Sequence, residues 1–493
     1  MGLGSISFVQ EPVDTASKVP VITNWTPIIG YMLYQDDISS LFYFKLIMEI
    51  RLTDASGTLL GKVKQRRNGY AADVAADEAR AFFDVKDILN SYLVDTVYDQ
   101  NDATAPFKTI HKLGANTDTK IFSKNGDQIS GKTQVATIYV KGYQEYSLAA
   151  NISPTENAGT SVNDTLRYMR AALPLMTARS TDTDYIQSNA FTTFSMLDDE
   201  SRFLSDLKTL IHRVPDIGLD AQTDGSRYSY VQDDDYYTVA FLNDTTNFGS
   251  EIDRFKVTLR NGNTSLAYAY FDVDSNGGIA PDDGSLADNG RLLYFGCGPG
   301  NLDVQNIQTT VRPSNQPTWN SIGIYPQTSG GGLAGHGIIL VRESARQDAS
   351  CKGFKVRRLA WVNSVGGYDY FNFNKKSTQT IEVKRDNYET LLGNYSENVF
   401  TYTNTQRGKR TRKVDSILKE VLQTGWLPEA HVEIIESLVQ SSRIDILENS
   451  DTEFTQSVLV TNSSFVRKTT ANDGIKIQYT INIEYANPLN TNI

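Results

Sequence analysis

Sulfur-containing and imidazole side chains are scarce in this chain, which has 2 cysteines, 6 methionines and 4 histidines among 493 residues. Two thiols do not make a disulfide framework, so Cys297 and Cys351 are predicted to be buried free thiols, although a single bridge between them is conceivable. The histidines have no partners at the spacing of a metal site or of a nucleophile and its base. They are His111, His212, His336 and His431. Histidine-assisted catalysis, a resident metal and a cofactor are therefore not expected.

Long apolar runs are also absent, and no window approaches the roughly 18 consecutive apolar residues that a membrane-spanning helix needs. The first residues, MGLGSISFVQEP, contain neither a basic segment nor a long apolar core, so no secretory signal is expected. Ile6 occupies the position at which N-myristoylation requires Ser or Thr. These absences predict a protein that has no membrane partner.

Positive charge is in deficit, because 47 Lys and Arg face 58 Asp and Glu and give a formal net charge of -11. A protein that coats nucleic acid needs clustered cations that release phosphate counterions, so this balance argues against such a role. It suits an assembly subunit, or a surface past which DNA moves without specific binding.

Aromatic residues are plentiful, with 26 Tyr and 21 Phe, and these favour strands together with Thr, Val and Ile. The predicted fold class is mainly β with minor α, in which several β-sandwich-like domains are joined by a mixed α/β connecting region. The expected parts are an N-terminal β-sandwich (1–149), a mixed helical connecting region (150–235), a second β-sandwich (236–375) and a C-terminal α+β module (376–493).

Hydrophobic periodicity predicts helices as well as strands. Asp84 is placed to cap a short helix that runs to Leu93. Further helices are predicted at Asp164–Met176, Asp198–His212, Val414–Leu422 and Pro428–Gln440. The strongest strand pattern closes the chain, since apolar residues alternate with polar ones from Ile475 to Tyr485. Its edge, if unpaired, is where a neighbouring subunit is expected to pair.

One segment, Gly126–Thr133, matches the P-loop expression G-x-x-x-x-G-K-[ST]. That motif requires a helix after the loop, whose amides hold phosphate. Here Gln134-Val-Ala-Thr-Ile-Tyr-Val follows, which alternates like a strand. A polar hairpin loop is the preferred interpretation.

A second segment, Asp272-Val-Asp274-Ser-Asn276-Gly-Gly-Ile, reproduces the first eight positions of an EF-hand calcium loop. Position twelve is Asp283, which is shorter than the usual bidentate Glu, and the preceding residues Ser265–Phe271 predict a strand instead of a helix. A polar turn is preferred, and a calcium-stabilised loop is the alternative.

The basic run Arg407–Lys413 (RGKRTRK) is the sharpest charge feature of this acidic chain. A solvated loop is the simplest interpretation, and a contact with an acidic neighbouring subunit is the preferred functional alternative.

Three segments resemble virion structural proteins of tailed bacteriophages, notably crAss-like and related phages of Bacteroidetes and marine bacteria. They are Phe82–Leu93 (FFDVKDILNSYL), Phe354–Phe373 (FKVRRLAWVNSVGGYDYFNF), and the C-terminal stretch with Arg443–Leu447 (RIDIL), Val458–Phe465 (VLVTNSSF) and the closing strand. The middle segment is the most specific, because Gly366-Gly367 permits a sharp turn next to an aromatic cluster that is expected to lie in a domain core. The resemblance leaves 95–350 uncovered.

The resemblance implies a non-enzymatic tail, ring or baseplate component that is assembled in the host cytoplasm into the tail or neck of the virion. The expected partners are copies of the chain in a cyclic ring, neighbouring tail, portal or adaptor proteins, and passing DNA that is not bound specifically. A head-decoration or fibre protein and a virion-associated polysaccharide-degrading enzyme with paired carboxylates are the alternatives.

Overall fold

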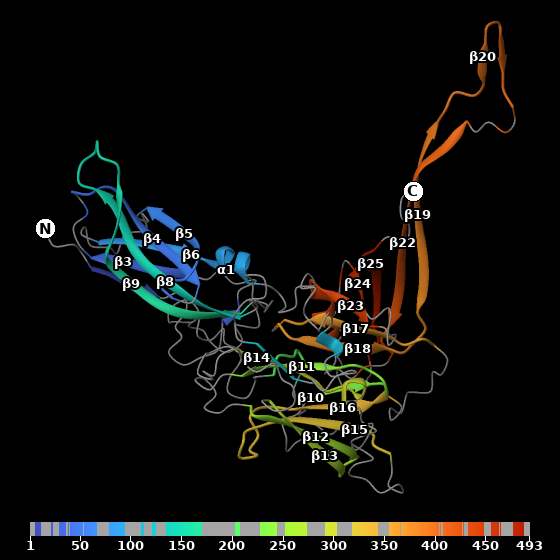
Figure 1. The fold of residues 1–493 in the computed structure, drawn as a ribbon, viewed down its shortest axis with the longest axis horizontal. Helices are drawn as coiled ribbons and strands as arrows, with labels where there is room; N and C mark the ends of the chain where they lie inside the picture. The colour runs from blue at the N-terminus through green and yellow to red at the C-terminus, as the bar shows by residue number, and fades with distance from the viewer. Residues whose placement is uncertain are drawn as a thin grey trace. The chain divides into compact units, whose positions relative to one another are not determined.

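The fold was analysed in a computed structural model of the chain (Figure 1). The structure describes residues 5–10, 21–22, 29–35, 38, 40–52, 54–66, 78–93, 110–112, 121–124, 135–169, 203–207, 227–243, 252–273, 291–302, 318–343, 354–364, 366–403, 405, 408–425, 427, 432–447, 455–462, 464 and 477–487. Of the interpretable residues, 61% are in strands and 9% in helices, which confirms the mainly β fold class. No described helix is long and apolar enough to cross a membrane.

The chain divides into two compact units, each of which is described by itself. The first contains Met1–Gln347 and Val362–Asp369, and the second contains Asp348–Trp361 and Tyr370–Ile493. The finer division into four parts stays a prediction.

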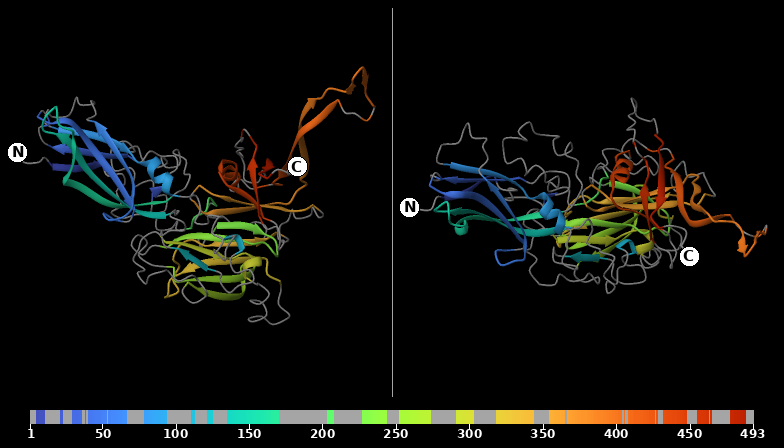
Figure 2. Two further views of the ribbon diagram at one scale, coloured as in Figure 1. Left: turned by 45° about the horizontal axis from the view of Figure 1, so that its top comes forward. Right: turned by 90° about the horizontal axis from the view of Figure 1, so that it is seen from above.

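Two sheets enclose the N-terminal core of the first unit, with strand orders β1-β3-β6 and β2-β9-β8-β4-β5 (Figure 2). Their bounds are β1 Ser5–Gln10, β2 Val21–Ile22, β3 Ile29–Gln35, β4 Phe42–Leu52, β5 Leu59–Arg66, β6 Glu78–Asp84, β8 Val135–Ser147 and β9 Thr155–Met169. Alternate residues of facing strands, such as Met32, Met48 and Phe83, are fully buried together. Helix α1 (Lys86–Tyr92) adds Leu89 to this core. Its N-cap is Val85, so the predicted cap at Asp84 is one residue early, although the Asp84 carboxylate accepts a hydrogen bond from the Lys86 amide.

Two further sheets of the first unit have the orders β10-β16-β15-β12-β13 and β11-β14-β7. Their strands are β7 Ile121–Lys124, β10 Arg227–Val231, β11 Thr238–Asn243, β12 Arg254–Asn261, β13 Thr264–Asp272, β14 Arg291–Gly296, β15 Ser321–Gln327 and β16 Ile338–Arg342, with the short helices η1 Ile110–Lys112 and α4 Pro299–Leu302. Buried rings join the two sheets, because Phe255 of β12 stacks on Phe295 of β14 at 4.5 Å between centroids and contacts Phe241 of β11 at 5.4 Å. Cys297 is buried as predicted and forms no disulfide among the described residues, whereas Cys351 lies outside them.

The second unit is built on one seven-stranded sheet with the order β18-β17-β23-β24-β25-β22-β19. The strands and helix of this sheet region are β17 Arg357–Val362, β18 Tyr368–Phe373, β19 Thr378–Glu389, β20 Asn394–Ser396, β21 Val399–Thr401, β22 Lys409–Gln423, α6 Val432–Gln440, β23 Ile444–Leu447, β24 Thr455–Val460 and β25 Thr480–Tyr485. The last residue of β17 and the first two of β18 are counted with the first unit. Helix α6 buries Val432, Ile434, Ile435 and Leu438. The aromatic side chains of β18 are buried, which confirms the predicted core role of the cluster.

Several predicted helices are wrong. Val414–Leu422 lies within β22, and Asp164–Met169 lies within β9, where strand pairing overrides the local helical spacing. Phe203–Leu207 is irregular backbone with one β-bridge, from Phe203 to Phe241. The last predicted helix is confirmed over Val432–Gln440.

The closing strand keeps its predicted alternation, since Ile477, Tyr479, Ile481 and Ile483 are buried. Both of its edges are paired, with β24 on one side and with β22 on the other, so the unpaired edge at which a neighbouring subunit could pair is not present. Ile475 and Lys476 lie outside the described residues.

Candidate functional site

Strands β19 and β22 form a long antiparallel hairpin that extends beyond the sheet of the second unit, and it is here called the arm (residues 378–423; Figure 1). At its root, Lys419–Gln423 of β22 also pair with β25. From Ser416 outward to Lys409, β22 pairs only with β19 among the described residues. The short strands β20 and β21 make a separate two-stranded ladder at the tip.

The arm exposes apolar side chains that a monomer would be expected to bury. All twelve residues of β19 are exposed, and the side chain of Leu391 at the tip is 81% exposed. Eight of the nineteen exposed large apolar side chains among the described residues belong to the arm: Ile381, Val383, Tyr388, Leu391, Leu392, Val399, Phe400 and Tyr402. An isolated two-stranded ribbon is only marginally stable in water. Because the arm is such a ribbon and exposes apolar side chains, it is expected to pack against a partner.

The root of the arm is fixed by a buried ion pair. Glu420 of β22 is 0% exposed and accepts hydrogen bonds from Arg357 Nε at 2.8 Å, Gln379 Nε2 at 3.1 Å and the Tyr485 hydroxyl at 2.8 Å. Burial alone would raise the pKa of Glu420, but these hydrogen bonds hold it below the usual value. The carboxylate thus ties β22 to β17, β19 and β25 at the point where the arm leaves the sheet.

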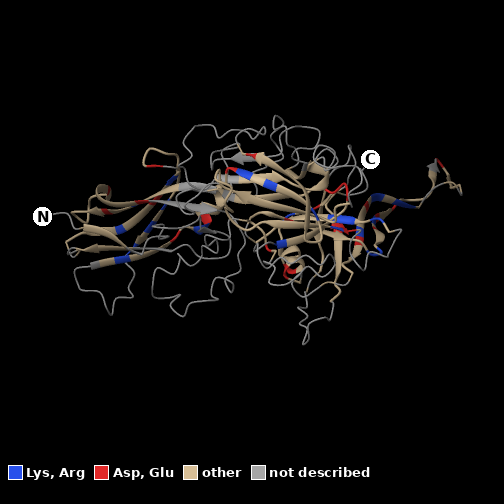
Figure 3. Cartoon of the chain, turned by 90° about the horizontal axis from the view of Figure 1, so that it is seen from below, with Lys and Arg blue, Asp and Glu red and all other residues tan. Residues whose placement is uncertain are grey.

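The basic run occupies the arm. Lys409–Lys413 form the first part of β22, so the interpretation as a solvated loop is wrong for these residues, whereas Arg407 lies outside the described part (Figure 3). Its contact with a neighbouring subunit stays a prediction.

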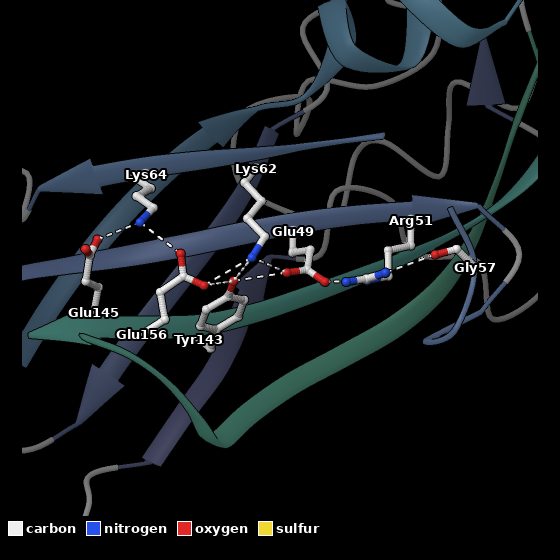
Figure 4. A network of polar contacts seen from close by, with 8 residues as sticks. All are labelled: Glu49, Arg51, Gly57, Lys62, Lys64, Tyr143, Glu145 and Glu156. Atoms are coloured by element: carbon white, nitrogen blue, oxygen red, sulfur yellow. Dashed lines mark hydrogen bonds and ion pairs between the residues drawn. The ribbon is translucent and has the colours of Figure 1, made fainter. Parts of the chain in front are cut away.

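A second candidate is a network of charged side chains on the sheet of β4, β5, β8 and β9 (Figure 4). Lys62 Nζ lies 2.9 Å from Glu49 Oε2, 3.1 Å from Glu156 Oε2 and 2.9 Å from the Tyr143 hydroxyl. That hydroxyl also lies 3.0 Å from Glu49 and 2.8 Å from Glu156. Lys64 joins the network by ion pairs of 2.9 Å to both Glu145 and Glu156.

The electrostatics of this network favour the ionised forms of Glu49 and Glu156. A hydrogen bond from Lys64 is the largest effect on Glu156 and lowers its pKa to about 2. Burial raises the pKa of Glu49, but hydrogen bonds from Lys62, Arg51 and Tyr143 outweigh it and leave that pKa lowered. A glycosidase needs one carboxyl group whose raised pKa keeps it protonated near neutral pH. Glu49 and Glu156 have the opposite shift, so the network acts as a cross-strand clamp.

Replacing Tyr143 with Phe is expected to destabilise the N-terminal sheets by about 1–2 kcal/mol, because the hydroxyl both accepts from Lys62 and donates to a carboxylate. Chemical denaturation of the purified chain would measure the loss. The matched control is Tyr43→Phe, whose exposed hydroxyl makes a single hydrogen bond to the Ala150 carbonyl. An equal loss in both variants would contradict the role of the network.

A third candidate lies in the glycine-containing segment 363–369, between β17 and β18. Asp369, which is 1% exposed, accepts hydrogen bonds from Ser205 Oγ at 2.5 Å, the Asp206 amide at 2.9 Å and Asn363 Nδ2 at 3.0 Å. Ser364 in turn donates to the Asp206 carboxylate. Burial first, and then the nearby Asp206, raise the pKa of Asp369 to about 7. Because all its oxygen partners are internal, this group holds the segments 203–207 and 363–369 together.

The Gly366-Gly367 pair makes the predicted sharp turn. Gly366 has φ 85°, and a Cβ on Gly367 would lie 1.9 Å from the Leu204 carbonyl oxygen. The Asn363 side chain closes the turn by accepting from the Gly367 amide at 2.8 Å and by donating to that same Leu204 oxygen at 3.0 Å.

Most of the motifs singled out by spacing lie outside the part of the chain that the structure describes. Gly126–Thr133 and the calcium-like loop from Asp274 onward lie outside the described residues, although the strands β8 and β13 next to them are confirmed. Among the described residues, no group of three or more His, Cys, Asp or Glu is placed to hold a metal ion. His111 is buried with its ring edge-on to Tyr368, and His336 is partly exposed in the loop between β15 and β16. His212 and His431 lie outside the described part.

No family model matches the chain, and no curated protein matches its sequence. The candidate sites are therefore interpreted from their own geometry.

Proposed function

We propose that the chain is a non-enzymatic structural subunit of a bacteriophage virion, which forms an oligomeric ring in the tail or neck around the DNA channel. The observation that carries the assembly role is the arm, a two-stranded ribbon with one strand wholly exposed and with eight exposed large apolar side chains. Such a surface is typical of a subunit whose exposed apolar side chains become buried when a neighbouring subunit packs against them.

The virion setting rests on the resemblance of three segments to tail, ring and baseplate proteins. One of these segments contains the turn at Gly366-Gly367 and the buried partners Asn363 and Asp369, so the residues that carry the resemblance also hold a buried polar network. The net charge of -11 supports a ring through which DNA passes without binding.

The enzymatic alternative has less support from the carboxylates that the structure describes. Glu49 and Glu156 share a lysine and a tyrosine and have lowered pKa values, and Asp369 is buried with its oxygens bonded internally. None of the three is placed as an accessible proton donor beside a second free carboxylate.

Electron microscopy of the purified full-length chain, with light scattering over a range of protein concentrations, tests the proposal. Closed rings with a central opening are expected. Dispersed monomers that hydrolyse bacterial capsule or peptidoglycan would overturn it in favour of the enzymatic alternative.

A further inference from the structure

The two faces of the arm differ in chemistry. In an antiparallel ladder, directly opposed residues project to the same side. One face near the root therefore contains Ile381 opposite Leu418 and Val383 opposite Ser416. Ile381 is 59% exposed and Val383 is 41% exposed, whereas Leu418 is partly buried and Ser416 is buried. The β19 side chains thus present an apolar surface to solvent on this face, which is here called the apolar face.

The opposite face neutralises its own charges. Lys384 lies opposite Asp415, and Asp386 lies opposite Lys413. Lys419 also forms an ion pair with Glu382, which completes an alternating set of cations and anions on this side of the ribbon. Lys413 forms an ion pair with Asp415 of the same strand. Because two cations of this face already pair with two of its carboxylates, the two faces together make an amphipathic ribbon whose apolar side is open.

The outer part of the arm has the opposite charge to the rest of the chain. Residues 384–413 contain seven Lys and Arg and three Asp and Glu, which is a net charge of +4. Since the whole chain has a net charge of -11, the remaining residues carry -15. A second copy of this chain is therefore acidic outside its own arm, and that negative charge attracts the basic outer arm. The outer arm also has thirty residues, about the number that one side of a standard protein interface uses.

We propose that the apolar face of the arm packs on a second copy of this chain, with the basic outer arm placed against acidic surface of that copy. This inference rests on the proposed function and names the part of the subunit that makes the ring contact. A head-to-tail contact of this kind is heterologous, since the arm of one copy meets a different surface of the next and the contact repeats around a ring.

Paired substitutions on the two faces of one strand test the inference in the full-length chain. Ile381→Asp with Val383→Asp places two charges on the apolar face, and Thr378→Asp with Thr380→Asp places the same two charges on the opposite face of β19. We expect the first variant to weaken association about 100-fold, because buried apolar anchors dominate interface energies, and the control to change it less than about threefold. Sedimentation equilibrium over a concentration series measures both, and added NaCl is expected to weaken the wild-type association.

Ile381→Thr with Val383→Thr keeps the β-branched side chains that favour a strand, and serves where the Asp variant fails to fold. We expect it to weaken association about tenfold. Wild-type rings that persist in both apolar-face variants would overturn this inference and leave the proposed function standing. A wild-type chain that stays monomeric at every concentration would overturn both. Binding of a labelled DNA duplex that the apolar-face variants abolish would replace the second copy with nucleic acid as the occupant.

Discussion

Replacing Glu420 with Ala is expected to destabilise the second unit by about 3–5 kcal/mol, the usual cost of removing one partner of a buried ion pair. The substitution leaves the Arg357 guanidinium without its carboxylate in a position that is nearly as buried as Glu420 itself. It also removes the acceptor for Gln379 and Tyr485. Chemical denaturation would measure the loss of stability. Hydrogen exchange would locate it, and the largest increases in amide exchange rate are expected in β17, β22 and β25.

The matched control is Glu382→Ala on β19, three positions along the strand from Gln379, which lies opposite Glu420. Glu382 also forms an ion pair with a lysine, Lys419, but both side chains are exposed, so no resolvable change is expected. Equal and small losses in the two variants would contradict the anchoring role of Glu420. The pKa of Glu420 is lowered in the folded state, so its stabilisation is present at neutral pH and is lost as the pH falls through that lowered value.

The elements that were predicted correctly are those whose hydrophobic pattern fits only one type of secondary structure. Ser265–Phe271 was predicted as a strand and lies within β13, and the closing alternation is present in β25. The helix beginning near Asp84 is also confirmed, because its apolar residues Val85 and Leu89 meet the N-terminal core. In each case local spacing and tertiary packing favour the same structure.

The error at Val414–Leu422 shows where local spacing fails. Val414, Ile417, Leu418, Val421 and Leu422 follow the i, i+3, i+4, i+7, i+8 spacing of an amphipathic helix. The same residues lie in a strand because β19 pairs with β22 from Lys409 to Val421 and β25 pairs with its last residues, Lys419–Gln423. In that strand Leu418 lies on the apolar face, and Ile417 lies on the opposite one.

The candidate sites were only partly within reach of the sequence. The basic run at Lys409–Lys413 marked β22, one of the two paired strands β19 and β22 of the arm. Their register was not predictable, because it depends on pairing across the whole hairpin. The contacts of Asp369 with Ser205 and Asp206 join residues more than 160 positions apart, and no local spacing signals them.

Replacing Asp369 with Ala is expected to destabilise the first unit by about 3 kcal/mol, because three buried donors lose their acceptor. Asp369→Asn is the matched control, since the amide keeps the shape, and Ser205 Oγ can accept from its nitrogen while its oxygen faces the Asp206 amide. We expect Asp369→Asn to lose much less stability than Asp369→Ala at pH 8. Urea denaturation monitored by circular dichroism would compare the two variants.

The pH dependence of the free energy of unfolding distinguishes the titration of the Asp369 carboxyl group from its packing. The pKa of Asp369 is raised from 3.8 to about 7 on folding, so the folded chain holds a proton that the unfolded chain has released between those values. Stability from this group therefore falls as the pH rises from about 4 to about 7, by roughly 1 kcal/mol per pH unit, and is level above that range. Asp369→Asn has no such proton to lose, so the difference between wild type and this variant should shrink or reverse towards pH 7. Parallel stability profiles of the two proteins from pH 5 to pH 8 would show that Asp369 keeps its charge throughout, and that the segments 203–207 and 363–369 are held by an ionised carboxylate.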